Sequence, residues 1–431
     1  MINALGLLKQ RRFLPLFITQ FLGAFNDNLF KTAMVLFATY EIFSNSETEQ
    51  SFNAVATAFG VLPFFLLSAL AGQLADTHDK ARIIRLVKTA EIGIMLFGGA
   101  GMLLAQAGHH TVGLVMMLAS VLMLGTHSTF FGPIKYAILP QHLKDDEVLG
   151  GTGLVEAATY LSILLGTVTA GWVAHDIRIA AALTLGVALV GWVTGRMVPP
   201  APRVGPKLKV NFNPITSSWK LISATMHIRR LFLAIVSISF FWTIGAVLIV
   251  IFPPLVKNVL TSDAFVSSLT IAVFSIGVAI GSVVINALLK GEISARYSPI
   301  SVIMMAVIVA AFSLEVRVWD PAPPGTLYGI AEFIARPQGW LVLATLLAIA
   351  VFGGMFVVPL YAFLTTTVTK DQTARTVAAN NVVNAGAMTV GALFVTGLSA
   401  AGVGPADMLL VVSAMCFVSA WLAQKLHKAC D

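Results

Sequence analysis

The stretch GQLADTHDKAR, residues 72–82, separates two long apolar segments of the chain. The segment before it, 52–75, and the segment after it, 83–106, each contain the roughly 20 apolar residues that a helix needs to cross a bilayer. A charged stretch of only eleven residues leaves no room for a domain between them. We therefore predict a short turn at a membrane surface that joins two spanning helices.

The composition of the whole chain supports a membrane protein. Of its 431 residues, 57 % are hydrophobic and 11 % are charged, and the mean hydropathy is +0.87. Soluble domains carry about 25 % charged residues. These values exclude a water-soluble enzyme and a disordered chain, and the two cysteines, Cys416 and Cys430, provide no disulfide framework.

Apolar runs of spanning length occur twelve times, which predicts an all-α membrane protein with twelve transmembrane helices. Lys9, Arg11 and Arg12 precede the first run as in a secretory signal, but this run is too long and lacks a small-residue cleavage site. The predicted spans are 13–43, 52–75, 83–106, 111–139, 149–174, 177–197, 230–252, 264–289, 298–314, 338–365, 376–400 and 406–424.

The positions of the basic residues predict the orientation. With both termini in the cytoplasm, most Lys and Arg residues fall in cytoplasmic segments, and the outer segments hold only Arg178, Lys257, Arg317 and Arg336. The net charge of +7 is therefore interpreted as a topology signal, and we do not expect nucleic-acid binding.

The longest polar stretch, 198–229, divides the chain into two halves of six spans, residues 1–197 and 230–431. It begins with PPAPRVGPKLKVNFNP, which is typical of a linker. Its later part places Trp219, Ile222 and Met226 at helical spacing beside Lys220 and two arginines. This part is either a short amphipathic helix on the inner membrane surface or a solvated linker with one or two helical turns.

An internal repeat relates the two halves. FGPIKYAILP, residues 131–140, aligns with FVVPLYAFLT, residues 356–365, at an offset of 225, so that Tyr136 matches Tyr361. The same offset places Glu156 on Asn381. Two parallel six-helix repeats resemble the architecture of the major facilitator superfamily, which we adopt as the predicted fold.

Residues 72–82 also resemble the superfamily signature between its second and third helices. The matching residues are Gly72, Asp76, Lys80 and Arg82, which we predict to gate the cytoplasmic side. Glycine allows two helices to approach closely, and the aspartate accepts hydrogen bonds from a helix N-terminus or pairs with a basic residue. The glycine that usually follows the aspartate is replaced by Asp79, and an ordinary charged turn is the alternative.

Polar residues inside the first span are candidates for substrate binding, because ionisable groups are costly in a bilayer. In FLGAFNDNLFK, residues 21–31, Asp27 is flanked by Asn26 and Asn28, and Lys31 follows on the same helix face. Asp27 lies about 21 Å along the helix from Phe13, near the bilayer centre. The cluster is either a site for Na⁺, a proton or a headgroup, or an internally neutralised Asp27–Lys31 pair.

Other membrane-embedded polar residues lie in later spans. Lys135 and Glu156 have similar predicted depths, so that they either pair and part during gating or form a permanent salt bridge. Lys88 and Glu91 are expected to pair locally. Three asparagines in ANNVVNAG line a polar cavity or join helices by hydrogen bonds; they are Asn380, Asn381 and Asn384.

Five segments together resemble the lysophospholipid transporter family of the major facilitator superfamily. They are QFLGAFNDNLFKTA, GQLADTHDKAR, FFGPIKYAILP, GLVEAATYLSILLGTVTAG and GGMFVVPLYAFL, in the family order. The resemblance implies a carrier that flips lysophosphatidylethanolamine and lysophosphatidylglycerol inward across the bacterial inner membrane. It also implies that Asp27, Asn28, Lys135 and Glu156 line the headgroup path. A separate cytoplasmic acyltransferase–acyl carrier protein synthetase is the implied partner.

Two departures from the family leave headgroup selectivity open. Asn26 stands where some members have glycine, and no basic residue lies between Arg230 and Lys257. The chain has no phosphate-binding GK[ST] loop and no His-x4-Asp acyltransferase pair. We therefore expect a monomeric carrier that is not an enzyme, without cofactor or metal, and Asp27 leaves coupling to Na⁺ or H⁺ open.

Two other functions are compatible with a membrane protein of this kind. One is export of a drug, siderophore or metal ion, because a fold does not fix the substrate. The other is a membrane scaffold or receptor for the acyltransferase, which predicts that the charges in the cavity can be replaced without loss.

Overall fold

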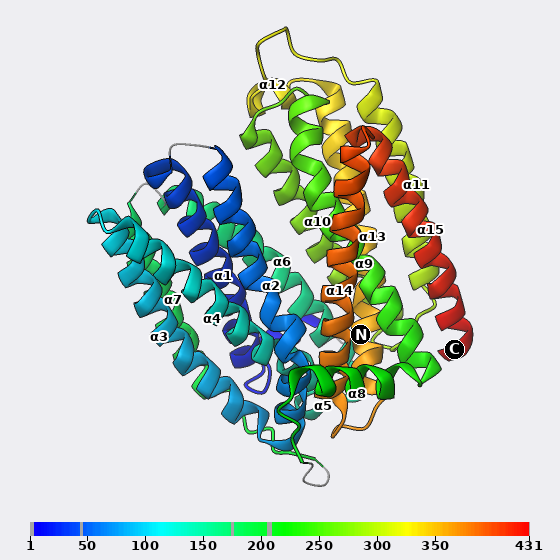
Figure 1. Ribbon diagram of the computed structural model, residues 1–431. Coiled ribbons are helices and arrows are strands. Elements are labelled where there is room, and N and C mark those ends of the chain that lie inside the picture. Colours follow the sequence, from blue (N-terminus) through cyan, green and yellow to red (C-terminus); the bar gives the residue numbers. More distant parts are fainter. Residues whose placement is uncertain (1–3, 44–45, 174–175, 205–208, 431) are drawn as a thin grey trace.

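The computed structural model describes residues 4–43, 46–173, 176–204 and 209–430, and these residues are almost entirely helical (Figure 1). The β-structure in the described residues is an isolated bridge between Ser262 and Tyr328. The helices are η1 (Ala4–Lys9), α1 (Leu14–Phe37), η2 (Ala38–Ile42), α2 (Ser46–Thr77), α3 (Lys80–Gln106), α4 (His110–Ala137), α5 (Leu139–His142), α6 (Asp145–Val173), α7 (Ile177–Met197), α8 (Pro214–Met226), α9 (Arg229–Asn258), α10 (Ala264–Leu289), α11 (Ser298–Arg317), α12 (Ile330–Ile334), α13 (Pro337–Thr366), α14 (Thr373–Ala400) and α15 (Pro405–Cys430).

Each predicted span corresponds to one long helix, which confirms the predicted fold class. Within the described residues, eleven helices are long and apolar enough to cross a membrane. The remaining predicted span corresponds to α1, which is 24 residues long but carries Asn26, Asp27, Asn28 and Lys31. The polar residues that mark α1 as a candidate site therefore also lower its hydropathy below that of the other spans.

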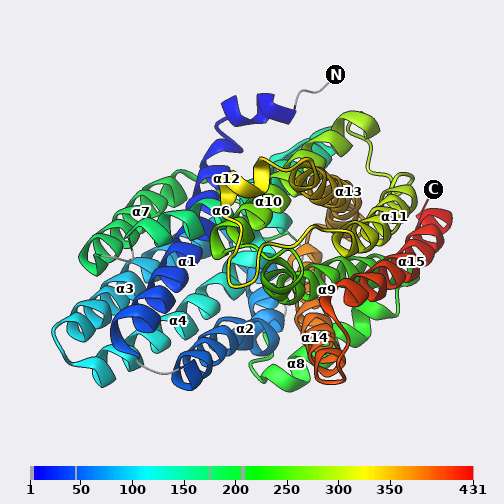
Figure 2. The ribbon, with the colours of Figure 1, turned by 90° about the horizontal axis from the view of Figure 1, so that it is seen from above.

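The helices form two bundles, α1–α7 and α9–α15 (Figures 1 and 2). The bundles approach one another at the end of the molecule that carries α8 and diverge toward the end that carries α12; we call these the α8 end and the α12 end (Figure 1). The main contacts between the bundles are α2 with α14 and α6 with α10. The predicted linker contributes α8, which lies across the α8 end and contacts α2, α14 and α9.

Close approach of α6 to α10 depends on Gly153. A Cβ atom at this position would lie 2.3 Å from the backbone oxygen of Ser282 on α10. Small residues allow membrane helices to approach this closely. Such packing matters in a bilayer, because no hydrophobic driving force holds the helices together there.

Large apolar side chains cover the outside of both bundles. Leu86, Val115, Val390 and Leu393 are all more than half exposed. A soluble protein does not expose apolar side chains on this scale, so this surface is suited to lipid.

Candidate functional site

The two bundles are joined at the α8 end by Asp76 of α2. Its carboxylate accepts hydrogen bonds from the backbone amides of Ala374 and Arg375, both at 3.0 Å, and from Nε of Arg375 at 2.9 Å. Asp76 thus caps the N-terminus of α14 and pairs with a basic residue of the other bundle. This contact joins α2 to α14.

Gly72, one helical turn before Asp76, allows the same two helices to touch. A Cβ atom at Gly72 would lie 2.6 Å from Cβ of Ala378 and 3.0 Å from the backbone oxygen of Ala374. Gly72, Asp76, Ala374, Arg375 and Ala378 therefore form one contact, which we call the α2–α14 gate after the role predicted for Gly72 and Asp76.

The other two residues of the predicted gating motif lie outside this contact. Lys80 is buried at the start of α3, and its Nζ has no hydrogen-bond partner among the described residues. Arg82 is exposed on α3. Asp79, which replaces the usual glycine, caps α3 through the amide of Ala81 at 2.8 Å.

Asp27 faces α4 from the middle of α1. One carboxylate oxygen accepts a short hydrogen bond from the hydroxyl of Ser128, and the other is buried without a hydrogen-bond partner in the described part of the chain. No ion pair joins Asp27 to Lys31 among the described residues, although the two interact electrostatically. Asn28 donates to the backbone of its own helix at Ala24.

Asn26 points to a different place from Asp27, into a fully buried ionic network. Its amide donates to Glu91 Oε1 at 2.9 Å, while Lys88 Nζ lies 2.6 Å and His127 Nε2 lies 3.2 Å from Glu91 Oε2. The expected Lys88–Glu91 pair is therefore present. We call these four residues the buried network; they join α1, α3 and α4 inside the N-terminal bundle.

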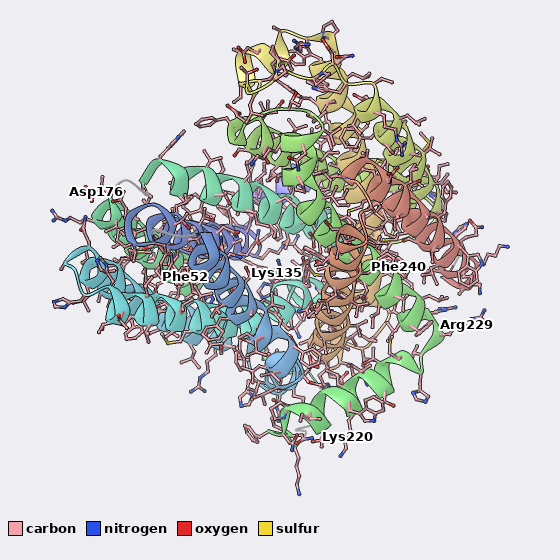
Figure 3. All side chains as sticks on the ribbon, turned by 45° about the horizontal axis from the view of Figure 1, so that its top comes forward. Phe52, Lys135, Asp176, Lys220, Arg229 and Phe240 are labelled. Atoms are coloured by element: carbon pink, nitrogen blue, oxygen red, sulfur yellow. The ribbon has the colours of Figure 1, made fainter. Side chains whose placement is uncertain are left out.

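Lys135 lies on α4 in the N-terminal bundle (Figure 3). Its Nζ donates to Thr159 at 3.2 Å, and Thr159 in turn donates to Gln20 of α1 at 3.2 Å. Glu156, instead of pairing with Lys135, accepts a short hydrogen bond from the hydroxyl of Tyr136. The second oxygen of Glu156 is buried and has no hydrogen-bond partner among the described residues.

Four aromatic residues, one of which is hydrogen-bonded to Glu156, join the bundles. Tyr136 stacks on Tyr361 with ring centroids 4.7 Å apart and an angle of 11° between the planes. Tyr160 stacks on Trp242 at 6.3 Å and 13°, and Trp242 Nε1 donates to the hydroxyl of Tyr361 at 2.8 Å. We call these four residues the aromatic cluster.

The three asparagines of α14 have different neighbours. Asn380 donates to the hydroxyl of Tyr361 at 3.5 Å, and Asn384 accepts from Ser239 of α9 at 2.7 Å. Asn381 is half-buried and faces Gly132 of α4, where an added Cβ would lie 3.4 Å from its Nδ2. Two of the three therefore join helices of the C-terminal bundle, and one faces the other bundle.

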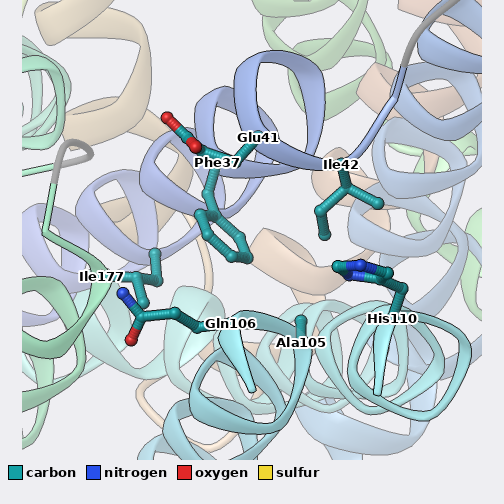
Figure 4. A pocket seen from close by; sticks show the side chains of 7 residues that line it. All are labelled: Phe37, Glu41, Ile42, Ala105, Gln106, His110 and Ile177. Carbon is teal, nitrogen blue, oxygen red and sulfur yellow. The ribbon is translucent and has the colours of Figure 1, made fainter. Parts of the chain in front are cut away.

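A small cavity of about 130 Å³ lies near the α12 end of the N-terminal bundle, away from these groups (Figure 4). Binding pockets for organic ligands usually measure about 300–1,000 Å³. Its lining residues are Phe37, Glu41, Ile42, Ala105, Gln106, His110 and Ile177. We do not assign a substrate to this cavity.

Several residues of the site do not stand out in the sequence. Ser128, Thr159 and Gln20 are uncharged residues within apolar helices, and only their partners reveal them. Arg375 is one of many basic residues near a helix end. The repeat, which aligns Tyr136 with Tyr361, is the signal that could have identified the stacked pair.

Comparison with protein families gives one match over most of the chain. The model described as Major Facilitator Superfamily matches residues 16–392. Two solved structures share the fold. The human organic anion transporter MFSD10 has a TM-score of 0.73 at 14 % identity, covering 96 % of this chain and 99 % of that one. A bacterial homologue of the iron transporter ferroportin in an outward-facing state has a TM-score of 0.73 at 16 % identity, covering 97 % and 100 %.

The curated relatives are more similar in sequence. The lysophospholipid transporter LplT of Cronobacter sakazakii is 27 % identical over 386 residues, which is 88 % of this chain and 85 % of the relative. LplT of Salmonella heidelberg is 28 % identical over 358 residues, or 81 % and 78 % of the two chains.

Proposed function

Because the chain belongs to the major facilitator superfamily and is a membrane transporter, we propose that it flips lysophospholipids across the bacterial inner membrane by alternating access of its two halves. The similarity to relatives named lysophospholipid transporter supports this cargo. The exporter of another small molecule on the same fold remains the rival.

The observation that carries the proposal is a group of three charged residues of the N-terminal bundle, none of which has an ion-pair partner among the described residues. Asp27 and Glu156 each have one buried oxygen without a hydrogen-bond partner among the described residues. Lys135 is hydrogen-bonded only to a neutral hydroxyl in this part of the chain, yet the charges of Glu156 and Asp27 act on it. Charged side chains are costly in a membrane, and these three do not form ion pairs with one another. They are therefore suited to binding a charged cargo.

A lysophosphatidylethanolamine headgroup has the complementary charges. Its phosphate is assigned to Lys135, with Lys31 as a second cation, and its ammonium to Asp27 or Glu156. Asn381 and Thr159 are neutral groups beside this path. The acyl chain is assigned to the aromatic cluster or to lipid, because it gains nothing from the polar side chains.

The basic residues support a cytoplasmic location for the α8 end. The start of α9 and the connections α10–α11 and α13–α14 lie at this end and contain Arg229, Lys290, Arg296 and Lys370. By the positive-inside rule both chain ends are then cytoplasmic, and the structure with a closed α2–α14 gate is outward-facing. Delivery of lysolipid to the inner leaflet matches the needs of a separate cytoplasmic acyltransferase.

The test is uptake of labelled lysophosphatidylethanolamine into proteoliposomes that contain the full chain. We expect uptake above protein-free vesicles, lost in Asp27→Asn and Lys135→Gln and kept in Glu315→Gln. Glu315 is the matched control, because this carboxylate accepts from Thr345 on α13, away from the proposed path. Absence of uptake by the intact protein contradicts the lysolipid assignment and favours another cargo.

Ion coupling and oligomeric state are predictions that the same preparation tests. Collapsing the Na⁺ gradient and the pH gradient separately shows whether either cation drives uptake. Cross-linking in the vesicles tests the expected monomer.

A further inference from the structure

Helix α8 has two chemically different faces. It begins at Pro214 and is capped by Asn213, whose side chain accepts from the amides of Ile215 and Thr216 at 3.1 Å. Ser217 and Thr225 on one face are buried against the bundle. The opposite face carries two largely exposed apolar side chains, Ile215, 77 % exposed, and Trp219, 74 % exposed, and Phe212, 71 % exposed, directly precedes the cap.

Ile215 and Trp219 form one stripe, because their spacing of four residues places them on the same side of the helix, and Phe212 lies just before the helix begins. Basic residues flank the stripe: Lys220 on α8, and Arg229 and Arg230 at the start of α9. All three are exposed, and none makes an ion pair with a described residue. Figure 3 shows Lys220 and Arg229 directed away from the bundles.

An exposed aromatic and aliphatic stripe beside unpaired basic residues is the pattern of a helix that lies in a membrane interface. Helix α8 runs across the ends of the spanning helices and not along them (Figure 1). Its stripe and its cations can therefore meet the acyl–headgroup boundary of the inner leaflet at the same time. Each cation near an anionic leaflet gains binding free energy, which favours phosphatidylglycerol over neutral lipid.

The buried face of α8 is bonded to the α2–α14 gate. Gln73, which follows Gly72, donates a short hydrogen bond from its amide to Ser217. The same side chain accepts from the backbone amide of Asn211 at 2.9 Å. Gln73 lies three residues before Asp76, and α8 also packs on α14. Helix α8 thus contacts both helices of the gate from the outside.

We propose that α8 is a lipid-binding strap that holds the α2–α14 gate closed when it engages anionic phospholipid in the inner leaflet. The position of α8 in the membrane is then coupled to the outward-facing state. This inference rests on the cytoplasmic orientation of the α8 end and not on the identity of the cargo, so it can fail or hold independently of the lysolipid assignment.

The experiment measures the gate directly in the full chain. The native cysteines are replaced in Cys416→Ala, Cys430→Ser, and spin labels are attached at His78→Cys and Thr369→Cys, which are exposed positions on either side of the gate. Distances are measured in proteoliposomes of phosphatidylcholine with and without phosphatidylglycerol. We expect the anionic lipid to increase the closed population.

The variants separate the strap from a general lipid effect. Ile215→Ser combined with Trp219→Ser should remove the response to phosphatidylglycerol. Lys220→Gln alone should weaken this response by up to about fivefold in the open-to-closed ratio. Trp172→Ser is the matched control, because Trp172 is equally exposed but lies at the far end of α6. A label at position 215 in an otherwise wild-type strap reports by oxygen accessibility whether α8 enters the bilayer.

Two results would overturn the proposal. One is a label at position 215 that stays in water with both lipid compositions. The other is a gate distance that responds to phosphatidylglycerol equally in the strap variants and in Trp172→Ser.

Discussion

Tyr136 and Tyr361 occupy equivalent positions in the two halves of the sequence and stack on each other between the two bundles. Their ring centroids are 4.7 Å apart, and an angle of 11° separates the planes. Both lie near the α8 end of their helices, α4 and α13. A repeat-related pair of this kind marks the internal axis of the molecule, and it must separate when the α8 end opens.

Removing the stack is therefore expected to favour the open gate. An aromatic pair contributes about 0.5–1.5 kcal/mol beyond its buried area, so Tyr361→Ala should raise the open-to-closed ratio by about two- to twelvefold. The gate distance between labels at positions 78 and 369 measures this ratio. Tyr328→Ala, at the α12 end, is the control and should leave the distance unchanged; a similar shift in both variants refutes the role of the stack.

Asp76→Asn tests the ionic part of the gate. The variant loses the charge that pairs with Arg375 and caps α14, and hydrogen bonds to charged groups contribute about 1.5–3 kcal/mol. We expect a clear shift toward the open distance. Arg82→Gln, which removes an exposed charge of the same motif, should have a much smaller effect. Equal shifts in the two variants would assign gating to the charge of the whole loop.

Gly72→Ala tests the steric part of the gate without a change of charge. The added Cβ would meet Cβ of Ala378 at 2.6 Å, so α2 and α14 must move apart. Gly93→Ala is the matched control, because nothing lies within 4 Å of a Cβ at that position. The prediction is an open gate in the first variant and a wild-type distance in the second, and closed distances in both would contradict it.

The spans and the polar residues of the site could be predicted from the sequence for a physical reason. A bilayer requires about 20 apolar residues in each helix and penalises charge, so both the helices and Asp27, Lys135 and Glu156 stand out in one dimension. The stacked pair of Tyr136 and Tyr361 could also have been predicted, from the internal repeat that aligns the two residues.

The partners of these residues could not be predicted in the same way. Asp76 and Arg375 are separated by 299 positions and meet only because α2 packs on α14. Lys135 and Glu156 are expected to pair with each other, at least in part of the cycle, but they bond to Thr159 and Tyr136. Hydropathy gives the depth of a residue, whereas rotation of its helix decides its partner.

The buried network is expected to stabilise the N-terminal bundle only as a complete set. Glu91→Gln leaves Lys88 without its counter-ion in a fully buried site, which costs about 3–5 kcal/mol. The double variant Lys88→Met, Glu91→Leu removes both charges and should recover much of the loss. Thermal unfolding in nanodiscs measures both.

The control for this network is Glu292→Gln. It breaks an exposed pair with Arg296 at 3.9 Å and should cost no more than about 1 kcal/mol. If Glu91→Gln unfolds at the wild-type temperature, the network does not stabilise the bundle and its charges are available for another role.

Headgroup selectivity provides the sharpest test of the proposed path, because lysophosphatidylethanolamine has an ammonium group and lysophosphatidylglycerol does not. If Asp27 binds the ammonium, Asp27→Asn should reduce uptake of the first lipid by about tenfold or more and affect the second much less. If Lys135 binds the phosphate, Lys135→Gln should reduce uptake of both. Competition between the two labelled lipids in one vesicle preparation measures the ratio without a correction for expression. An Asp27→Asn variant that loses both lipids equally would show that Asp27 acts on the transport cycle and not on the headgroup, and it would direct the search for the ammonium site to Glu156.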